Sequence, residues 1–146
     1  MAYNMAYSAY KKTGVQTASR GKLVVMLYDE AVRQLGIAEG FFEADSKVKP
    51  KNMDKLNAAV LKTQEIITEL IVSLDMTNGG NEIARNLLSL YNYFNRELFD
   101  ANITQNKEKI TFIRNMMNEL RGAWAQAERT TQTPVADLDH AVSING

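Results

Sequence analysis

The chain has 146 residues, with 17 basic and 17 acidic side chains and therefore no formal net charge at pH 7. This length is typical of one domain with a sizeable core, and the balanced charge argues against a nucleic-acid binder, which normally shows a basic excess. Because there is no cysteine, disulfides and thiol catalysis are excluded, and because no apolar run approaches the ~20 residues of a membrane span, we expect a cytoplasmic protein without membrane insertion.

The N-terminal segment, residues 1–18, is rich in aromatic side chains. Tyr3, Tyr7 and Tyr10 are spaced as on one face of a short helix. A helix of this length is not stable alone, so the segment has two interpretations. It is either a tethered segment that covers part of the core or a movable lid over a binding groove, and the two are compatible.

The first long helix is predicted over residues 19–43, with Ser19 as its N-cap. One face of this helix is a continuous apolar stripe that includes Val24, Tyr28 and Leu35. Further large apolar side chains fall outside the stripe. A helix this apolar is either central in its domain or holds a partner as well as a core. The side chains outside the stripe are Leu23, Met26, Ile37 and Phe41.

Three more amphipathic helices are predicted, over residues 52–75, 81–103 and 107–129. A polar link ending at Pro50, a Thr77–Gly80 turn and a Thr104–Asn106 link separate them. Short links make neighbouring helices antiparallel, so we predict an all-α fold, an up-down four-helix bundle over 19–129. It carries the short N-terminal helical segment, and residues 130–146 are predicted to be a flexible tail.

No catalytic or metal-binding pattern is present in the predicted core. The only histidine, His140, lies in the tail, so neither a di-iron site with paired histidines nor a Ser-His-Asp triad can be assembled. The four apolar stripes contain no carboxylates, and no glycine-rich phosphate loop follows a strand. We therefore expect neither an enzyme nor a protein that holds a cofactor or metal.

Several large apolar side chains are not needed for the four core stripes. These surplus side chains either fill a wide core or form hydrophobic grooves for the amphipathic helices of a partner. The seven methionines of the chain suit an adaptable surface. Asp29, in the polar sector of the first helix, is either solvated or faces the partner. The surplus residues are Met26, Ile37, Phe41, Leu61, Ile66, Leu88, Tyr93, Phe99 and Phe112.

Several short motifs, in order and over about residues 8–125, resemble the FliS family of flagellar secretion chaperones. Each motif is weak alone, but their order and spacing are specific. A proline usually follows the position of Ser19 in that family, whereas Arg20-Gly21 stands here, which predicts a less rigid start of the first helix. The motifs are Tyr10, Val15-x-Thr17-Ala18-Ser19, Leu23, Met26-Leu27-Tyr28-Asp29, Leu70…Leu74-Asp75, Gly79–Ala84, Leu90-Tyr91-x-Tyr93, Leu98-x-x-Ala101-Asn102 and Ala123-Trp124.

The resemblance implies a chaperone without catalysis, which binds the disordered C-terminal segment of flagellin. It implies that the chaperone prevents premature polymerisation and delivers flagellin to the export gate of the flagellar type III apparatus, and that the N-terminal segment can lie over the groove. The partner segment would fold on binding. The residues expected to bind the partner, in a groove or through the lid, are Tyr7, Tyr10, Val15, Leu23, Met26, Asp29, Ile37, Phe41, Leu88, Tyr93 and Phe99.

Two alternatives stay open at this point. One is a regulatory adaptor whose groove holds another helical ligand, such as an anti-sigma factor or a flagellar assembly factor. The other is a self-associating bundle whose surplus apolar surface forms a homodimer. The expected oligomeric state of the chaperone itself is a monomer or a weak homodimer.

Overall fold

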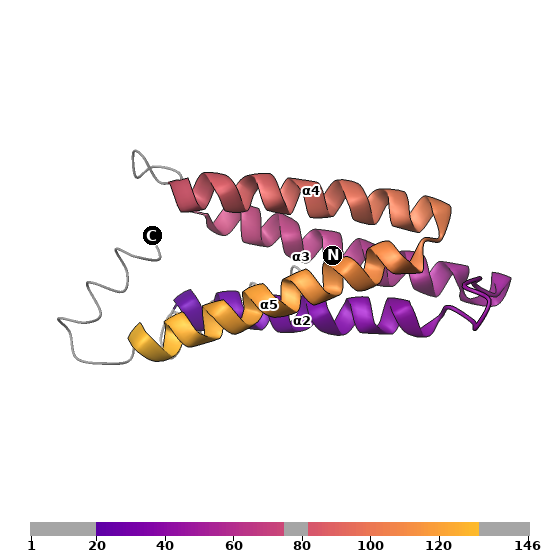
Figure 1. The fold of residues 1–146 in the computed structure, drawn as a ribbon, viewed down its shortest axis with the longest axis horizontal. Coiled ribbons are helices and arrows are strands. Elements are labelled where there is room, and N and C mark those ends of the chain that lie inside the picture. Colours follow the sequence, from indigo (N-terminus) through magenta and orange to yellow (C-terminus); the bar gives the residue numbers. More distant parts are fainter. Residues whose placement is uncertain (1–19, 75–81, 132–146) are drawn as a thin grey trace.

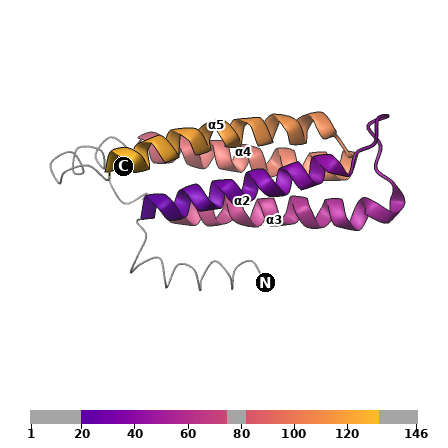
Figure 2. The ribbon, with the colours of Figure 1, turned by 90° about the horizontal axis from the view of Figure 1, so that it is seen from below.

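The computed structural model describes residues 20–74 and 82–131. Successive helices run antiparallel, and the last helix returns to lie beside the first, as Figures 1 and 2 show. The described residues confirm the predicted all-α, up-down bundle. The division of the chain at residues 18 and 130 stays a prediction. The helices are α2 (Arg20–Gly40), the short 3-10 helix η1 (Pro50–Asn52), α3 (Met53–Ser73), α4 (Glu82–Thr104) and α5 (Lys107–Thr131).

The connection between α2 and α3 is an ordered turn rather than a simple polar link. Helix α2 ends at Gly40, before the predicted end at residue 43, because the chain then folds back on itself. Phe42 and Val48 form an isolated antiparallel bridge and are both buried. The Ser46 N–H donates to the Glu43 carbonyl at 2.9 Å, and Ser46 adopts a left-handed φ of 65°. This turn closes one end of the bundle with apolar side chains.

The other described helix ends also have local causes. Pro50 stands at the start of η1, where its missing N–H costs nothing. The Oδ1 atom of Asn106 accepts a hydrogen bond from the Lys109 N–H at 3.2 Å and so caps α5. The Arg20 guanidinium at the start of α2 donates to the Ser73 carbonyl at the end of α3, which satisfies a carbonyl that the helix leaves free. Arg20 therefore fastens the first turn of α2 to α3.

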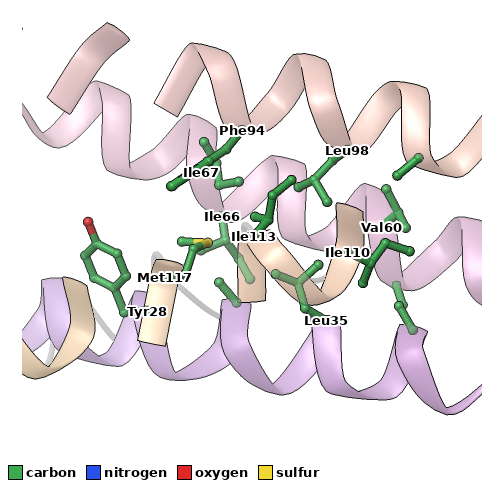
Figure 3. Packing of buried hydrophobic residues seen from close by; sticks show 14 of the residues in the cluster. Tyr28, Leu35, Val60, Ile66, Ile67, Phe94, Leu98, Ile110, Ile113 and Met117 are labelled. Atoms are coloured by element: carbon green, nitrogen blue, oxygen red, sulfur yellow. The ribbon is translucent and has the colours of Figure 1, made fainter. Parts of the chain in front are cut away.

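A continuous apolar core runs along the bundle axis (Figure 3). All four helices contribute to it, as the four predicted stripes require, and interiors of this kind are close-packed. Two side chains outside the predicted stripes are buried. Ile66 belongs to the core cluster, which is one of the two roles left open for the surplus residues, and Leu23 of α2 is buried although it is not part of that cluster. The buried side chains labelled in Figure 3 are Tyr28, Leu35, Val60, Ile66, Ile67, Phe94, Leu98, Ile110, Ile113 and Met117.

A pair of tyrosines crosses the core from α2 to α4. The Tyr28 and Tyr91 hydroxyls are hydrogen-bonded to each other, and their ring centroids lie 6.4 Å apart at an angle of 50°. Trp124 of α5 packs against the same core. Buried hydroxyls need partners, so the tyrosine pair links α2 and α4 inside the bundle.

Burial raises the pKa of both the Tyr28 and Tyr91 hydroxyls, and for Tyr28 the neighbouring tyrosine raises it further. The neutral forms are thus favoured in the folded state. Since the folded pKa values lie above the unfolded value of about 10, the linked stability is complete below about pH 10 and is lost as the pH rises further.

We expect the free energy of unfolding to fall steeply above about pH 10. The double variant Tyr28→Phe/Tyr91→Phe should lose stability less steeply, because it has no buried hydroxyls to ionise. Urea titrations followed by circular dichroism over a pH series measure both slopes. Equal slopes for the two proteins would show that these hydroxyls do not cause the alkaline loss.

Candidate functional site

The interior of the bundle offers no reactive centre among the described residues. Residues 20–74 and 82–131 contain no group of three or more His, Cys, Asp or Glu side chains that could hold a metal ion. Glu128 is the one buried carboxylate in these ranges, and a single carboxylate does not bind a metal ion tightly. None of the described helices combines the length and hydropathy needed to span a bilayer.

The seam between α2 and α5, meaning the line where these helices meet, is bordered by polar pairs. Asp29 of α2 forms an ion pair with Arg121 of α5. Glu39 accepts a hydrogen bond from the Thr111 hydroxyl at 2.6 Å and pairs with Arg114. These contacts give Asp29 a role within the fold, in addition to the two roles considered from the sequence. This seam presents charge rather than apolar surface to a partner.

Apolar side chains lie exposed along α3 and α4 instead. Gln64 of α3 hydrogen-bonds the Asn95 carbonyl of α4 at 3.0 Å, which fixes how the two helices face each other. Around this contact a set of large apolar side chains is open to solvent, which is uncommon for a monomeric surface. We call this surface the α3/α4 face. Its exposed fractions are Leu61 53%, Val72 73%, Phe99 62% and Ile103 66%, and Leu88 is half-buried.

A hollow of about 450 Å³ lies between α4 and α5. Tyr93 and Phe112, both exposed, line it together with the buried Ile113. On its rim the Lys109 ammonium bridges Asp100 at 2.5 Å and Glu97 at 3.6 Å. The hollow thus joins aromatic walls to a charged rim, the composition of a protein-binding groove.

A third apolar surface follows the flank of α2 that faces α3. Met26 and Ile37 are exposed there, at 43% and 38%, and Phe41 packs half-buried against the core. Glu30 lies between them, and its pKa is lowered chiefly by Arg33, with a smaller contribution from Lys62 of α3. We call Met26, Ile37 and Phe41 the α2 flank.

The predicted partner-binding residues therefore do not form one cluster. Met26, Ile37 and Phe41 lie on the α2 flank, Leu88 and Phe99 on the α3/α4 face, and Tyr93 in the α4/α5 hollow. Leu23 is buried. The expectations for Tyr7, Tyr10 and Val15, for the lid and for the tail fall outside the described residues.

Two exposed residues of the α3/α4 face were missed by the sequence reasoning as binding candidates. Neither Val72 nor Ile103 is among the surplus apolar residues predicted from the sequence. The sequence spacing could have identified Ile103, because Phe99 and Ile103 are four residues apart in α4. Residues at this spacing lie on the same face of a helix. Pairing α3 with α4 was needed to bring Val72 into the same surface.

Comparison with known proteins gives a consistent result. Residues 2–131 match the sequence model of the family described as "Flagellar protein FliS". A "Flagellar secretion chaperone FliS" of Bacillus subtilis (strain 168) is 31% identical, over 87% of this chain and 89% of that protein. The Campylobacter jejuni protein of that name is 34% identical over 86% and 93%. The Escherichia coli (strain K12) protein is 28% identical over 82% and 86%.

Proposed function

Since this chain belongs to the FliS family of flagellar secretion chaperones, we propose that it binds the C-terminal segment of newly made flagellin in the cytoplasm. Binding keeps this segment from polymerising early and allows its delivery to the export gate of the flagellar type III apparatus. No cofactor takes part. The chain acts by covering and releasing a partner segment.

The observation that supports this proposal is the contrast between the inside and the outside of the bundle. The core is filled by buried side chains from all four described helices, so the exposed apolar residues are not needed to complete it. They border three of the four seams, and the α2/α5 seam is bordered by polar pairs. A disordered segment that folds into short helices can follow such a series of grooves, since coupled folding suits large, extended interfaces.

Light scattering with and without a synthetic flagellin C-terminal peptide tests the proposal. We expect a complex of one chaperone and one peptide, with the mass of a monomer plus the peptide. A stable dimer that ignores the peptide would favour the self-associating bundle and overturn the proposal. Competition by an anti-sigma factor at the same surface would add a regulatory role to it.

Met26→Asp is expected to weaken peptide binding by about tenfold to a hundredfold, because a buried methionine contributes about 1.5–3 kcal/mol and each 1.4 kcal/mol is tenfold. Folding should change little, since Met26 is exposed. Isothermal titration calorimetry gives the affinity and circular dichroism gives the melting temperature. Asn118→Asp, at an exposed position of α5, adds the same charge away from the apolar surfaces and should bind normally. If Met26→Asp lowers the melting temperature strongly, the loss of binding would reflect unfolding, and Met26 would belong to the core.

A further inference from the structure

Two helical stripes of exposed or half-buried side chains border the α3/α4 face. On α3 the residues at 54, 58, 61, 65, 68 and 72 share one side, and on α4 those at 85, 88, 92, 96, 99 and 103 do so, since each series advances by three or four. In both stripes apolar residues stand on either side of a polar middle. This repeated order is not needed for packing of the bundle, because the side chains point away from the core.

The register of α3 and α4 places apolar residues of one stripe beside apolar residues of the other. The hydrogen bond from Gln64 to the Asn95 carbonyl sets the level at which the antiparallel helices meet. Leu61 then lies at the level of Phe99, and Val72 lies at the level of Leu88. The α3/α4 face has two apolar sites, one at each of these levels.

The polar middle between the two apolar sites has one free charge of each sign. Glu65 stands on α3 and Arg96 on α4, and within the described residues neither forms an ion pair. The α3 side of the face is thus acidic at its centre and the α4 side is basic. A partner with the opposite arrangement of charge would be complementary to both.

The distance between the apolar sites distinguishes a helical occupant from an extended one. Leu61 and Val72 are eleven residues apart in α3, which is about 16 Å at about 1.5 Å per residue. On a partner helix the same distance again takes about eleven residues. The two anchors then fall on one face, because eleven residues make just over three whole turns. An extended strand would cover it in about five residues at about 3.3 Å each.

We propose that the α3/α4 face takes one helix of the flagellin segment, with two apolar anchors at positions i and i+11 and, midway between them, one basic and one acidic side chain. The basic side chain meets Glu65 and the acidic one meets Arg96. The other apolar surfaces then receive other parts of the segment. This inference rests on the proposed function, and it adds the sequence pattern that the bound helix must have.

Binding of the flagellin C-terminal peptide to the wild-type chaperone is measured first, because its absence would overturn the proposed function itself. Designed helical peptides with apolar anchors at i and i+7, i and i+11, or i and i+14 then test the spacing by calorimetry. All three keep the anchors on nearly one face, at about 100° per residue. We expect the i+11 peptide to bind at least about tenfold more tightly, since in each of the others only one anchor reaches its site. Equal affinities would overturn the spacing.

Substitutions in the chaperone test the location. Phe99→Asp should weaken binding of the i+11 peptide by about tenfold or more, whereas Phe112→Asp in the α4/α5 hollow should not. Both side chains are exposed, so circular dichroism should show two folded proteins. The reverse result, with flagellin binding intact, would move the helix to the α4/α5 hollow and overturn only this inference.

The charges are tested by reversal. Glu65→Lys should weaken the i+11 peptide by about twofold to fivefold, as expected for an exposed ion pair. Exchanging the basic side chain of the peptide for an acidic one should restore the affinity for this variant and reduce it for the wild type. If the effects of Glu65→Lys and of the exchange in the peptide simply add, Glu65 and the basic side chain of the peptide are not in contact.

Discussion

Truncating Phe94 to alanine is expected to lower the free energy of unfolding by about 3–5 kcal/mol, the range for large aromatic side chains in a core. Phe94 is fully buried in α4 and points into the centre of the bundle (Figure 3). Its neighbours Ile67 and Leu98 belong to the same cluster. Because the helices that surround the cavity are held by many other contacts, we expect only partial collapse into the space left behind.

Phe99→Ala is the matched control, on the same helix and with the same atoms removed. Phe99 is 62% exposed, so its truncation should leave the free energy of unfolding within about 0.5 kcal/mol of the wild type. Urea denaturation of both variants measures the difference. A similar loss at the two positions would mean that the α3/α4 face is covered within the chain and is not available to a partner.

Tyr91→Phe is expected to destabilise the fold by about 1–3 kcal/mol, although it removes only one oxygen atom. The Tyr28 hydroxyl loses the hydroxyl to which it is hydrogen-bonded and stays buried, and an unpaired buried polar group costs its full desolvation. The measurement is again the free energy of unfolding from urea titration.

The double variant Tyr28→Phe/Tyr91→Phe separates this cause from a loss of packing. With both hydroxyls absent, no donor is stranded, so the double variant should lose less than the sum of the two single variants. Strict additivity would indicate that the two hydroxyls contribute independently, in spite of their hydrogen bond.

The fold could be predicted because each helix has its own apolar stripe. Leu56, Val60, Ile67 and Leu70 recur at helical spacing, and all four are buried in α3. Ile66 lies outside the predicted stripe of α3 and is nevertheless buried, because a helical wheel of one helix does not show how far the neighbouring helices wrap around it. Phe42 is buried in the turn after α2 rather than in the helix itself, and such a reversal depends on Val48 as much as on local spacing.

The ends of the helices set another limit on prediction. Met53 and Ile83 sit on their stripes yet are exposed, at 37% and 46%. Each lies in the first turn of its helix, at one end of the bundle. The spacing of apolar residues predicts which side of a helix faces the core. It does not predict whether a residue lies at the middle or at the end of the bundle, where burial is lower.

The sequence predicts which residues are surplus to the core stripes but not where they lie relative to one another. Met26, Phe99 and Phe112 are exposed, which is one of the two outcomes that the sequence left open. Their division among three surfaces depends on which helices are adjacent, and the charge that closes the α2/α5 seam comes from residues far apart in sequence. Asp29 illustrates the point, since its partner Arg121 lies on the last helix.

The packing of Trp124 against the core also supplies an optical probe. Trp124 is the single tryptophan of the chain, and the cluster against which it packs contains both Tyr28 and Tyr91. Its emission, excited directly or by energy transfer from the two tyrosines, reports whether α2, α4 and α5 are assembled. It lies away from the α3/α4 face, so a labelled peptide docking there and the integrity of the bundle can be followed in one sample as two separate signals.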